Sequence, residues 1–226
     1  MNGLIQIAGV IDSPEAKMLM DLSVDYLGFP LRLPVNKDDL SEDDAVEVIK
    51  GINPPHKAVL ITYLDNSKDI IDFCNKLNVN IVQLHGKIEM NELKELKLTR
   101  PDIVVIKSLV VNGDNYADLE NIVTTMSPWI DLYITDTFDP VTGASGATGK
   151  THDWQISRNL VKISPKPIIL AGGLNPANVR EAILNIKPAG VDVHTGVESP
   201  DGRKDYNLVS QFVSEVKKAF SEITIY

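Results

Sequence analysis

The sequence predicts a (β/α)8 barrel, and three observations support this. Short β-rich runs alternate with longer segments of helical periodicity from one end of the chain to the other. The chain has 226 residues, a length at which α/β barrels are usually single domains. No break in composition separates one part from another, so we expect one barrel domain over residues 1–226. An open, doubly wound sheet is the alternative, because periodicity does not report whether a sheet closes.

Each predicted strand is a short apolar run bounded by polar or turn-forming residues. The eight runs are Leu4–Ala8, Asp25–Phe29, Ala58–Thr62, Asn80–Leu84, Ile103–Lys107, Leu132–Asp136, Pro167–Ala171 and Gly190–His194.

The segments between these runs have helical periodicity, and several begin at residues that favour helix N-termini. Asp12 or Ser13 can cap the first helix, Ser41 the second, and Asn66 with Ser67 the third. Later helices are expected at about Glu89–Leu98, at Tyr116–Met126, after Trp154, after Asn178 and around Asn207–Phe220.

Composition excludes several classes of partner. The net charge of -9 argues against a nucleic acid or an anionic membrane, although backbone N–H groups can still bind an anionic small molecule. Cys74 is the single cysteine, so an intrachain disulfide and a cysteine-based zinc site are excluded, and its core spacing predicts a buried, inert thiol. The N-terminus lacks a targeting pattern and no apolar run is long enough to span a membrane, so we expect a cytoplasmic protein.

The strand ends should carry the chemistry, because barrel active sites lie at the carboxyl ends of the strands. Asp136 ends the sixth run, and a loop with Gly143, Gly146 and Gly149 follows it. A carboxylate beside a glycine-rich loop can place a proton donor under a lid, while a plain surface linker is the alternative. Lys107 and Ser108 are expected at the end of the fifth run.

Two glycine turns follow the last two strands. Gly172 with Gly173, and Thr195 with Gly196, stand where barrels commonly hold a phosphate on backbone N–H groups. Tight turns without a ligand are the alternative. His85 follows the fourth run, either as a substrate contact or as a hydrogen-bonded structural residue, and the structural role is favoured.

Taken together, these motifs resemble the phosphoribosylanthranilate isomerase family of tryptophan biosynthesis. The matching segments occur in family order and cover nearly the whole chain: 7–9, 27–29, 82–86, 135–137, 146–154, 170–179, 191–198 and 202–205. The resemblance implies a (β/α)8 enzyme that performs an Amadori rearrangement of an aminoaldose to a 1-deoxyketose without a cofactor. It implies that Asp136 is the general acid, that the two glycine turns hold the phosphate, and that Asp192 is a further inward-facing carboxylate.

The sequence departs from the family at two functional positions. The family's general base is a cysteine at the end of the first strand, where this chain has Ala8. The family's arginine for the anthranilate carboxylate has no clear equivalent in the segment 34–38, and Arg32 is a candidate substitute. His194, where the family usually has a small polar residue, is a candidate replacement base.

Three hypotheses follow from these matches and departures. The first is an isomerase of this family with a displaced base. The second is a divergent barrel acting on another phosphosugar, and the third is a catalytically inactive homologue that binds a phosphate ligand. In each case we expect a small phosphorylated sugar as ligand, no metal, no nucleic acid or membrane partner, and a monomer or homodimer.

Overall fold

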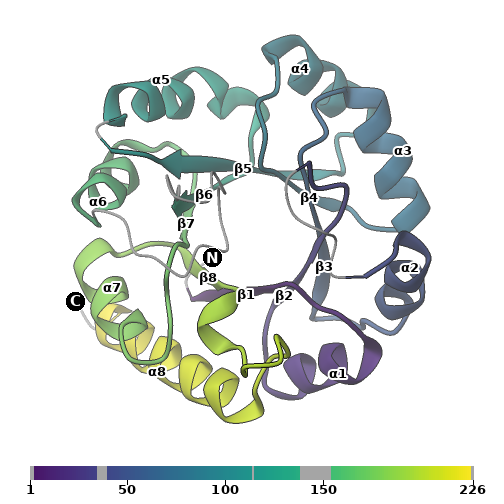
Figure 1. The fold of residues 1–226 in the computed structure, drawn as a ribbon. Coiled ribbons are helices and arrows are strands. Elements are labelled where there is room, and N and C mark those ends of the chain that lie inside the picture. The colour runs from purple at the N-terminus through teal and green to yellow at the C-terminus, as the bar shows by residue number, and fades with distance from the viewer. Residues whose placement is uncertain (1–2, 35–39, 114, 138–153, 225–226) are drawn as a thin grey trace.

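The strands form a closed parallel barrel in the order β1 to β8, and the helices form a ring around it (Figure 1). The computed structural model describes residues 3–34, 40–113, 115–137 and 154–224. Because β1 pairs with both β2 and β8, the sheet closes. The prediction of a (β/α)8 barrel is therefore confirmed, and the open-sheet alternative is wrong.

The observed strands agree with the predicted runs to within a few residues. They are β1 Leu4–Ala8, β2 Tyr26–Pro30, β3 Lys57–Thr62, β4 Ile81–Leu84, β5 Val104–Val111, β6 Leu132–Thr137, β7 Ile168–Leu170 and β8 Gly190–Val193. The helices are α1 Ser13–Asp21, α2 Glu42–Lys50, α3 Ser67–Leu77, α4 Met90–Thr99, α5 Tyr116–Met126, α6 Trp154–Ile163, α7 Val179–Ile186 and α8 Tyr206–Thr224, with short 3-10 turns η1 Ser127–Trp129 and η2 Thr195–Val197.

Three predicted caps start their helices. Asp12 accepts a hydrogen bond from the Glu15 N–H at 2.9 Å, and Ser41 accepts one from the Asp44 N–H at 3.1 Å. Asn66 accepts from the N–H groups of both residues 68 and 69. Each cap satisfies backbone donors that the first turn leaves unpaired.

Side chains alternate between the two faces of each strand and so contribute to two separate apolar cores. In β1, Ile5 and Ile7 belong to the large core between sheet and helices, while Leu4 and Ala8 belong to the smaller core inside the barrel. Since side chains alternate along a strand, Gln6 also faces the interior, and it is fully buried. Cys74 lies in the outer core, where burial raises the pKa of its thiol to about 12, so the predicted buried thiol is confirmed.

Strand β5 is longer than the sequence indicated. The apolar run continues past Lys107, and β5 pairs with β6 as far as Val111. Lys107 and Ser108 therefore lie within the strand, and placing them at its end was wrong. The Lys107 amine donates to the backbone oxygens of Leu84 and Ser108 at 3.3 and 3.0 Å, and burial lowers its pKa to about 8.

At the amino ends of the strands, two aspartates tie neighbouring strands together in the same way. Asp25 donates its N–H to the Ile5 oxygen, and its carboxylate accepts the Ile5 N–H at 2.8 Å. Asp131 does the same to Val105, again with 2.8 Å from carboxylate to N–H, and also pairs with Lys97 at 2.9 Å. These two carboxylates thus provide acceptors for the backbone N–H groups of Ile5 and Val105 at the amino ends of the strands.

Candidate active site at the carboxyl ends of the strands

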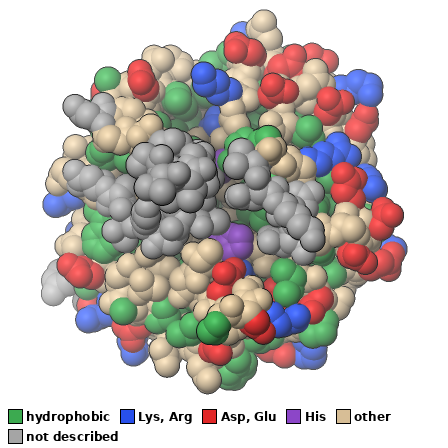
Figure 2. All heavy atoms as spheres, viewed as in Figure 1, with side chains coloured by type: hydrophobic (Ala, Val, Ile, Leu, Met, Phe, Trp, Pro, Cys, Tyr) green, Lys and Arg blue, Asp and Glu red, His purple; other side chains and the backbone are tan. Residues whose placement is uncertain are grey.

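Figure 2 views the molecule from the same side as Figure 1. A histidine side chain is visible near the centre of this face, and acidic and basic side chains are most frequent towards its periphery. The predicted loop glycines Gly143, Gly146 and Gly149 lie outside the described residues, and so do most of the residues in segment 34–38.

Asp136 is the penultimate residue of β6 and is buried. Its Oδ1 accepts a hydrogen bond from the Thr137 N–H at 2.7 Å. Burial raises the pKa of Asp136 to about 7, although that hydrogen bond opposes the shift. A carboxyl group with this pKa exchanges protons near neutral pH, as a general acid must.

His85 joins Asp136 to a small polar cluster. Its Nδ1 lies 3.1 Å from the Ser108 hydroxyl and 3.8 Å from the Asp136 Oδ2 atom. The Tyr63 ring lies against the imidazole with 4.9 Å between centroids, and burial, together with the charge of Asp136, raises the Tyr63 pKa to about 12. His85 therefore combines structural hydrogen bonding with a place beside the candidate acid.

Asp192 faces the same interior from β8. Burial first, and then the charge of Asp136, raise its pKa to about 7, against the opposing effects of Gln6 and Lys204. Among the described residues, its Oδ1 has no hydrogen-bond partner. Asp136 and Asp192 thus form an electrostatically coupled pair of carboxyl groups, in which ionisation of one disfavours ionisation of the other.

Gln6 lies opposite Asp192 in the β1–β8 register. Its amide nitrogen donates to the Gln83 side-chain oxygen at 2.8 Å, while its own Oε1 is unpaired within the described part of the chain. Sequence reasoning gave no role to Gln6, Tyr63 or Ser108. The alternation of β1 could have found Gln6, because it lies two residues before Ala8 and on the same face.

His194 follows β8 and is held by polar neighbours. Its Nε2 lies 3.3 Å from the Glu198 carboxylate, which also pairs with the buried Lys204 amine at 2.5 Å. A Cβ added to Gly9 would lie 2.2 Å from the same Nε2, so the imidazole packs directly on the backbone that follows Ala8. Burial and the charge of Lys204 lower the His194 pKa to about 3.

The two glycine turns meet at one edge of the barrel. Gly172 and Gly173 have φ values of 99° and 65°, which side chains adopt rarely, and neither N–H has an acceptor among the described residues. A Cβ on Gly196 would lie 1.9 Å from the Leu174 oxygen, so this close contact requires glycine. The Gly173 oxygen accepts from the Asn178 amide at 3.0 Å, which holds the first turn in place.

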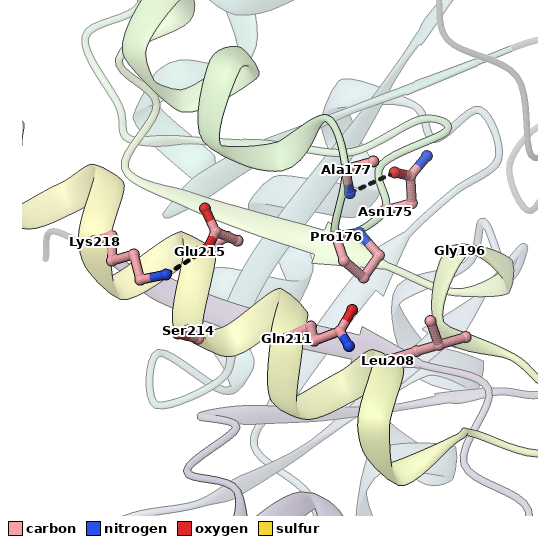
Figure 3. A pocket seen from close by; sticks show the side chains of 9 residues that line it. All are labelled: Asn175, Pro176, Ala177, Gly196, Leu208, Gln211, Ser214, Glu215 and Lys218. Carbon is pink, nitrogen blue, oxygen red and sulfur yellow. Dashed lines mark hydrogen bonds and ion pairs between the residues drawn. The ribbon is translucent and has the colours of Figure 1, made fainter.

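An open groove of about 640 Å³ lies behind these turns, between the start of α7 and α8 (Figure 3). Of the residues in the two glycine turns, Gly196 alone lines this groove. Its α8 wall carries Leu208, Gln211 and the Glu215–Lys218 ion pair of 2.6 Å. The candidate acid Asp136 does not line this groove.

Arg32 is held in the helical layer. Its guanidinium pairs with Glu42 of α2 at 2.8 Å and stacks 3.8 Å from the centre of the Phe73 ring of α3. The structure therefore brings Asp136, His85 and Asp192 together, whereas the Arg32 guanidinium binds Glu42 and Phe73 in the helical layer.

In the described part of the chain, no cluster of three or more His, Cys, Asp or Glu side chains could hold a metal ion, and no helix is long and apolar enough to cross a membrane.

The family model and the curated relatives agree on one family. The family described as N-(5'phosphoribosyl)anthranilate (PRA) isomerase matches residues 5–215. N-(5'-phosphoribosyl)anthranilate isomerase 2 of Methanosarcina mazei is 34% identical over 97% of this chain and 96% of its own, and the isomerase of Haloferax volcanii is 32% identical over 95% and 93%.

Solved structures of the same family have the same fold as this chain. Phosphoribosyl anthranilate isomerase from Thermotoga maritima superposes with a TM-score of 0.81, at 28% identity, over 96% of this chain and 99% of that one. A second isomerase structure, in complex with reduced 1-(o-carboxyphenylamino)-1-deoxyribulose 5-phosphate, has a TM-score of 0.78 at 26% identity, with coverages of 96% and 99%.

Proposed function

The chain belongs to the N-(5'-phosphoribosyl)anthranilate isomerase family, and we propose that Asp136 is its general acid, with the base supplied by β8. The substrate is N-(5'-phosphoribosyl)anthranilate, and the product is the corresponding 1-deoxyribulose 5-phosphate. The observation that carries this assignment is the buried Asp136 carboxyl, whose pKa of about 7 lets it hold a proton and release it near neutral pH.

Ring opening and enol formation need two proton transfers, at the ring oxygen and at C2, which are both bonded to C1. In the first, Asp136 protonates the ring oxygen of the aminoaldose, the C1–O bond breaks, and the nitrogen lone pair forms a C1=N iminium. In the second, a base removes the proton on C2, the C–H electron pair forms C1=C2, and the C1=N electrons return to nitrogen. Tautomerisation of the resulting enol to the ketone completes an isomerisation that balances without a cofactor.

The base must come from another residue, because Ala8 cannot accept a proton. Two titratable groups at the end of β8, Asp192 and His194, lie on the side of the barrel next to β1. We assign the second proton transfer to this end of β8.

The two glycine turns form the proposed phosphate seat. The positive φ values of Gly172 and Gly173 expose their N–H groups, and the close contact at Gly196 brings the second turn against the first. Backbone donors of this kind bind phosphate without positive side chains, which fits the net charge of -9.

The cellular setting follows from this activity. We propose a cytoplasmic enzyme of tryptophan biosynthesis whose ligand is a small phosphorylated sugar, with no nucleic-acid partner. Monomeric and homodimeric forms both fit, since one structural relative is described as mutually generated monomers of the dimeric isomerase from Thermotoga maritima.

Turnover of freshly prepared N-(5'-phosphoribosyl)anthranilate by the purified protein tests the proposal. The wild-type protein should consume it, as followed by the optical signal of the anthranilate group, and Asp136→Asn should lose this activity while remaining folded, with a melting temperature no lower than that of wild type. A wild-type protein that produced no 1-deoxyribulose phosphate would overturn the proposed reaction.

A second candidate function is isomerisation of another phosphosugar. It is favoured by the engagement of Arg32 with Glu42 and Phe73, which leaves the anthranilate carboxylate without its sequence-predicted partner. A ligand that binds the native state raises its melting temperature. A phosphosugar that stabilised the protein when the anthranilate-bearing product did not would support this second candidate.

A further inference from the structure

The end of β8 lies beside the position of the missing base. Gln6 pairs with Asp192 and Ile7 with Val193 in the parallel register of β1 and β8, so Ala8 follows the last pair of this register, and the His194 ring packs on the next residue, Gly9. The Ala8 methyl belongs to the apolar cluster inside the barrel. A group on β8 can therefore reach the part of the interior that a longer side chain at residue 8 would occupy.

His194 is the weaker of the two acceptors at this end of β8. Its Nε2 faces the Glu198 carboxylate at 3.3 Å and packs on Gly9, so this nitrogen is engaged by the protein. Burial and Lys204 lower its pKa to about 3, and an imidazole with so low a pKa binds a proton poorly near neutral pH.

Asp192, by contrast, has a buried oxygen that is available to accept a proton. Its Oδ1 is shielded from solvent and has no partner among the described residues, while its strand neighbour Gln6 carries another unpaired oxygen, Oε1. Unpaired buried acceptors are rare, and those that occur call for a ligand or a proton. Lys204, the basic side chain that lowers the pKa of Asp192, forms an ion pair with the Glu198 carboxylate at 2.5 Å.

We propose that Asp192 is the catalytic base of this enzyme, with Oδ1 accepting the C2 proton of the aminoaldose phosphate. This inference rests on the proposed function. The C2–H electrons form C1=C2, and the iminium electrons return to nitrogen. Asp192 then delivers its proton to C1 while the C2 hydroxyl gives its proton to the Asp136 carboxylate and becomes the ketone, so both carboxyl groups return to their starting states. The mutual repulsion of Asp136 and Asp192 favours one protonated and one ionised carboxyl, which matches an acid paired with a base.

The first test compares Asp192→Asn with wild type on N-(5'-phosphoribosyl)anthranilate. Loss of a general base costs about 10²- to 10⁴-fold, so kcat should fall by that factor while KM changes by no more than about threefold. Asp118→Asn, at the exposed start of α5, is the matched control and should retain full activity. If Asp192→Asn does not fold, Asp192→Glu serves instead, because moving the carboxylate by one methylene should still reduce kcat more than about tenfold.

The second test restores a base at residue 8. In the Asp192→Asn background, Ala8→Cys should recover at least about tenfold in kcat, because a thiolate then lies beside the same carbon. A residue that merely binds a substrate hydroxyl would show no such recovery and would raise KM. Wild-type inactivity would overturn the proposed function itself, whereas an active wild type with Asp192→Asn within tenfold of it would overturn the assignment of Asp192 alone.

Discussion

Aspartates at the two ends of this barrel have opposite surroundings. At the amino ends of the strands, Asp25 and Asp131 each accept a backbone N–H at 2.8 Å and so join neighbouring strands. At the carboxyl ends, burial raises the pKa of both Asp136 and Asp192, the charge of Asp136 adds to the shift at Asp192, and the Asp192 Oδ1 atom has no partner among the described residues.

The difference separates stability from reactivity within one residue type. A carboxylate that accepts a backbone N–H joins neighbouring strands and holds the backbone in place. A buried carboxyl short of donors binds protons more readily, so it costs folding energy when ionised and becomes available for proton transfer. The same division between a stabilising and a reactive face is general for barrels of this fold.

The largest expected effect that tests this comparison is on catalysis. Asp136→Asn should lower kcat/KM by about 10²- to 10⁴-fold, equivalent to about 3–5 kcal/mol, because the amide cannot donate a proton to the ring oxygen. Steady-state turnover of N-(5'-phosphoribosyl)anthranilate measures this. Activity within tenfold of wild type in the folded variant would remove Asp136 from the mechanism.

The next effect is on the pH dependence of stability. The folded pKa of Asp136 is about 7, against 3.8 for an unperturbed carboxyl. The native state therefore holds a proton that the unfolded state releases, and the resulting stability is fully present below about pH 4 and lost as pH rises through about 7. The loss is on the order of 4 kcal/mol for one such buried carboxyl.

Asp136→Asn removes this loss and also removes a charge that raises the pKa of Asp192. The variant should accordingly gain stability over wild type as pH rises from 5 to 8, and denaturant unfolding at several pH values measures the gap. A gap that stays constant across this range would show that Asp136 is ionised in the folded protein at all these pH values.

Much of the fold could be predicted from the sequence, because barrel strands and helices are local patterns. Capping residues such as Ser41 and apolar runs such as Leu4–Ala8 specify their elements within a few neighbouring residues. The predicted end of β5 was wrong because a charged lysine at residue 107 is typical of the end of an apolar strand. In the folded protein the Lys107 amine is buried and donates to two backbone oxygens, a contact that depends on tertiary structure.

The site was harder to predict, since its chemistry depends on neighbours that are distant in sequence. The resemblance pointed to Asp136 and the glycine turns, but the engagement of Arg32 by Glu42 and Phe73 requires the packing of α2 on α3. Likewise, the contact of His194 with Gly9 joins the two ends of the chain. Sequence spacing carries no information on such contacts.

A smaller effect is expected at the proposed phosphate seat. The Cβ of Gly196→Ala would approach the Leu174 oxygen to 1.9 Å, so the second turn must move away from the first. KM for the phosphorylated substrate should rise about 10- to 100-fold with kcat less affected, because the phosphate contact is shared by ground and transition states. Gly51→Ala is the control, since its Cβ would come no closer than 3.3 Å to another atom, and an unchanged KM in Gly196→Ala would exclude the turn as the phosphate seat.

The smallest effect is expected at the opposite end of the barrel, where the loss should appear in stability alone. Asp25→Ala leaves the Ile5 N–H without its acceptor, and Asp131→Ala does the same to Val105, so each should cost about 1–3 kcal/mol in urea unfolding. Asp131→Asn keeps a carbonyl acceptor and should recover part of that loss. Because both sites lie far along their strands from Asp136, kcat should stay within about twofold of wild type. A folded Asp25 or Asp131 variant that lost activity more than tenfold would break the division between a stabilising end and a reactive end.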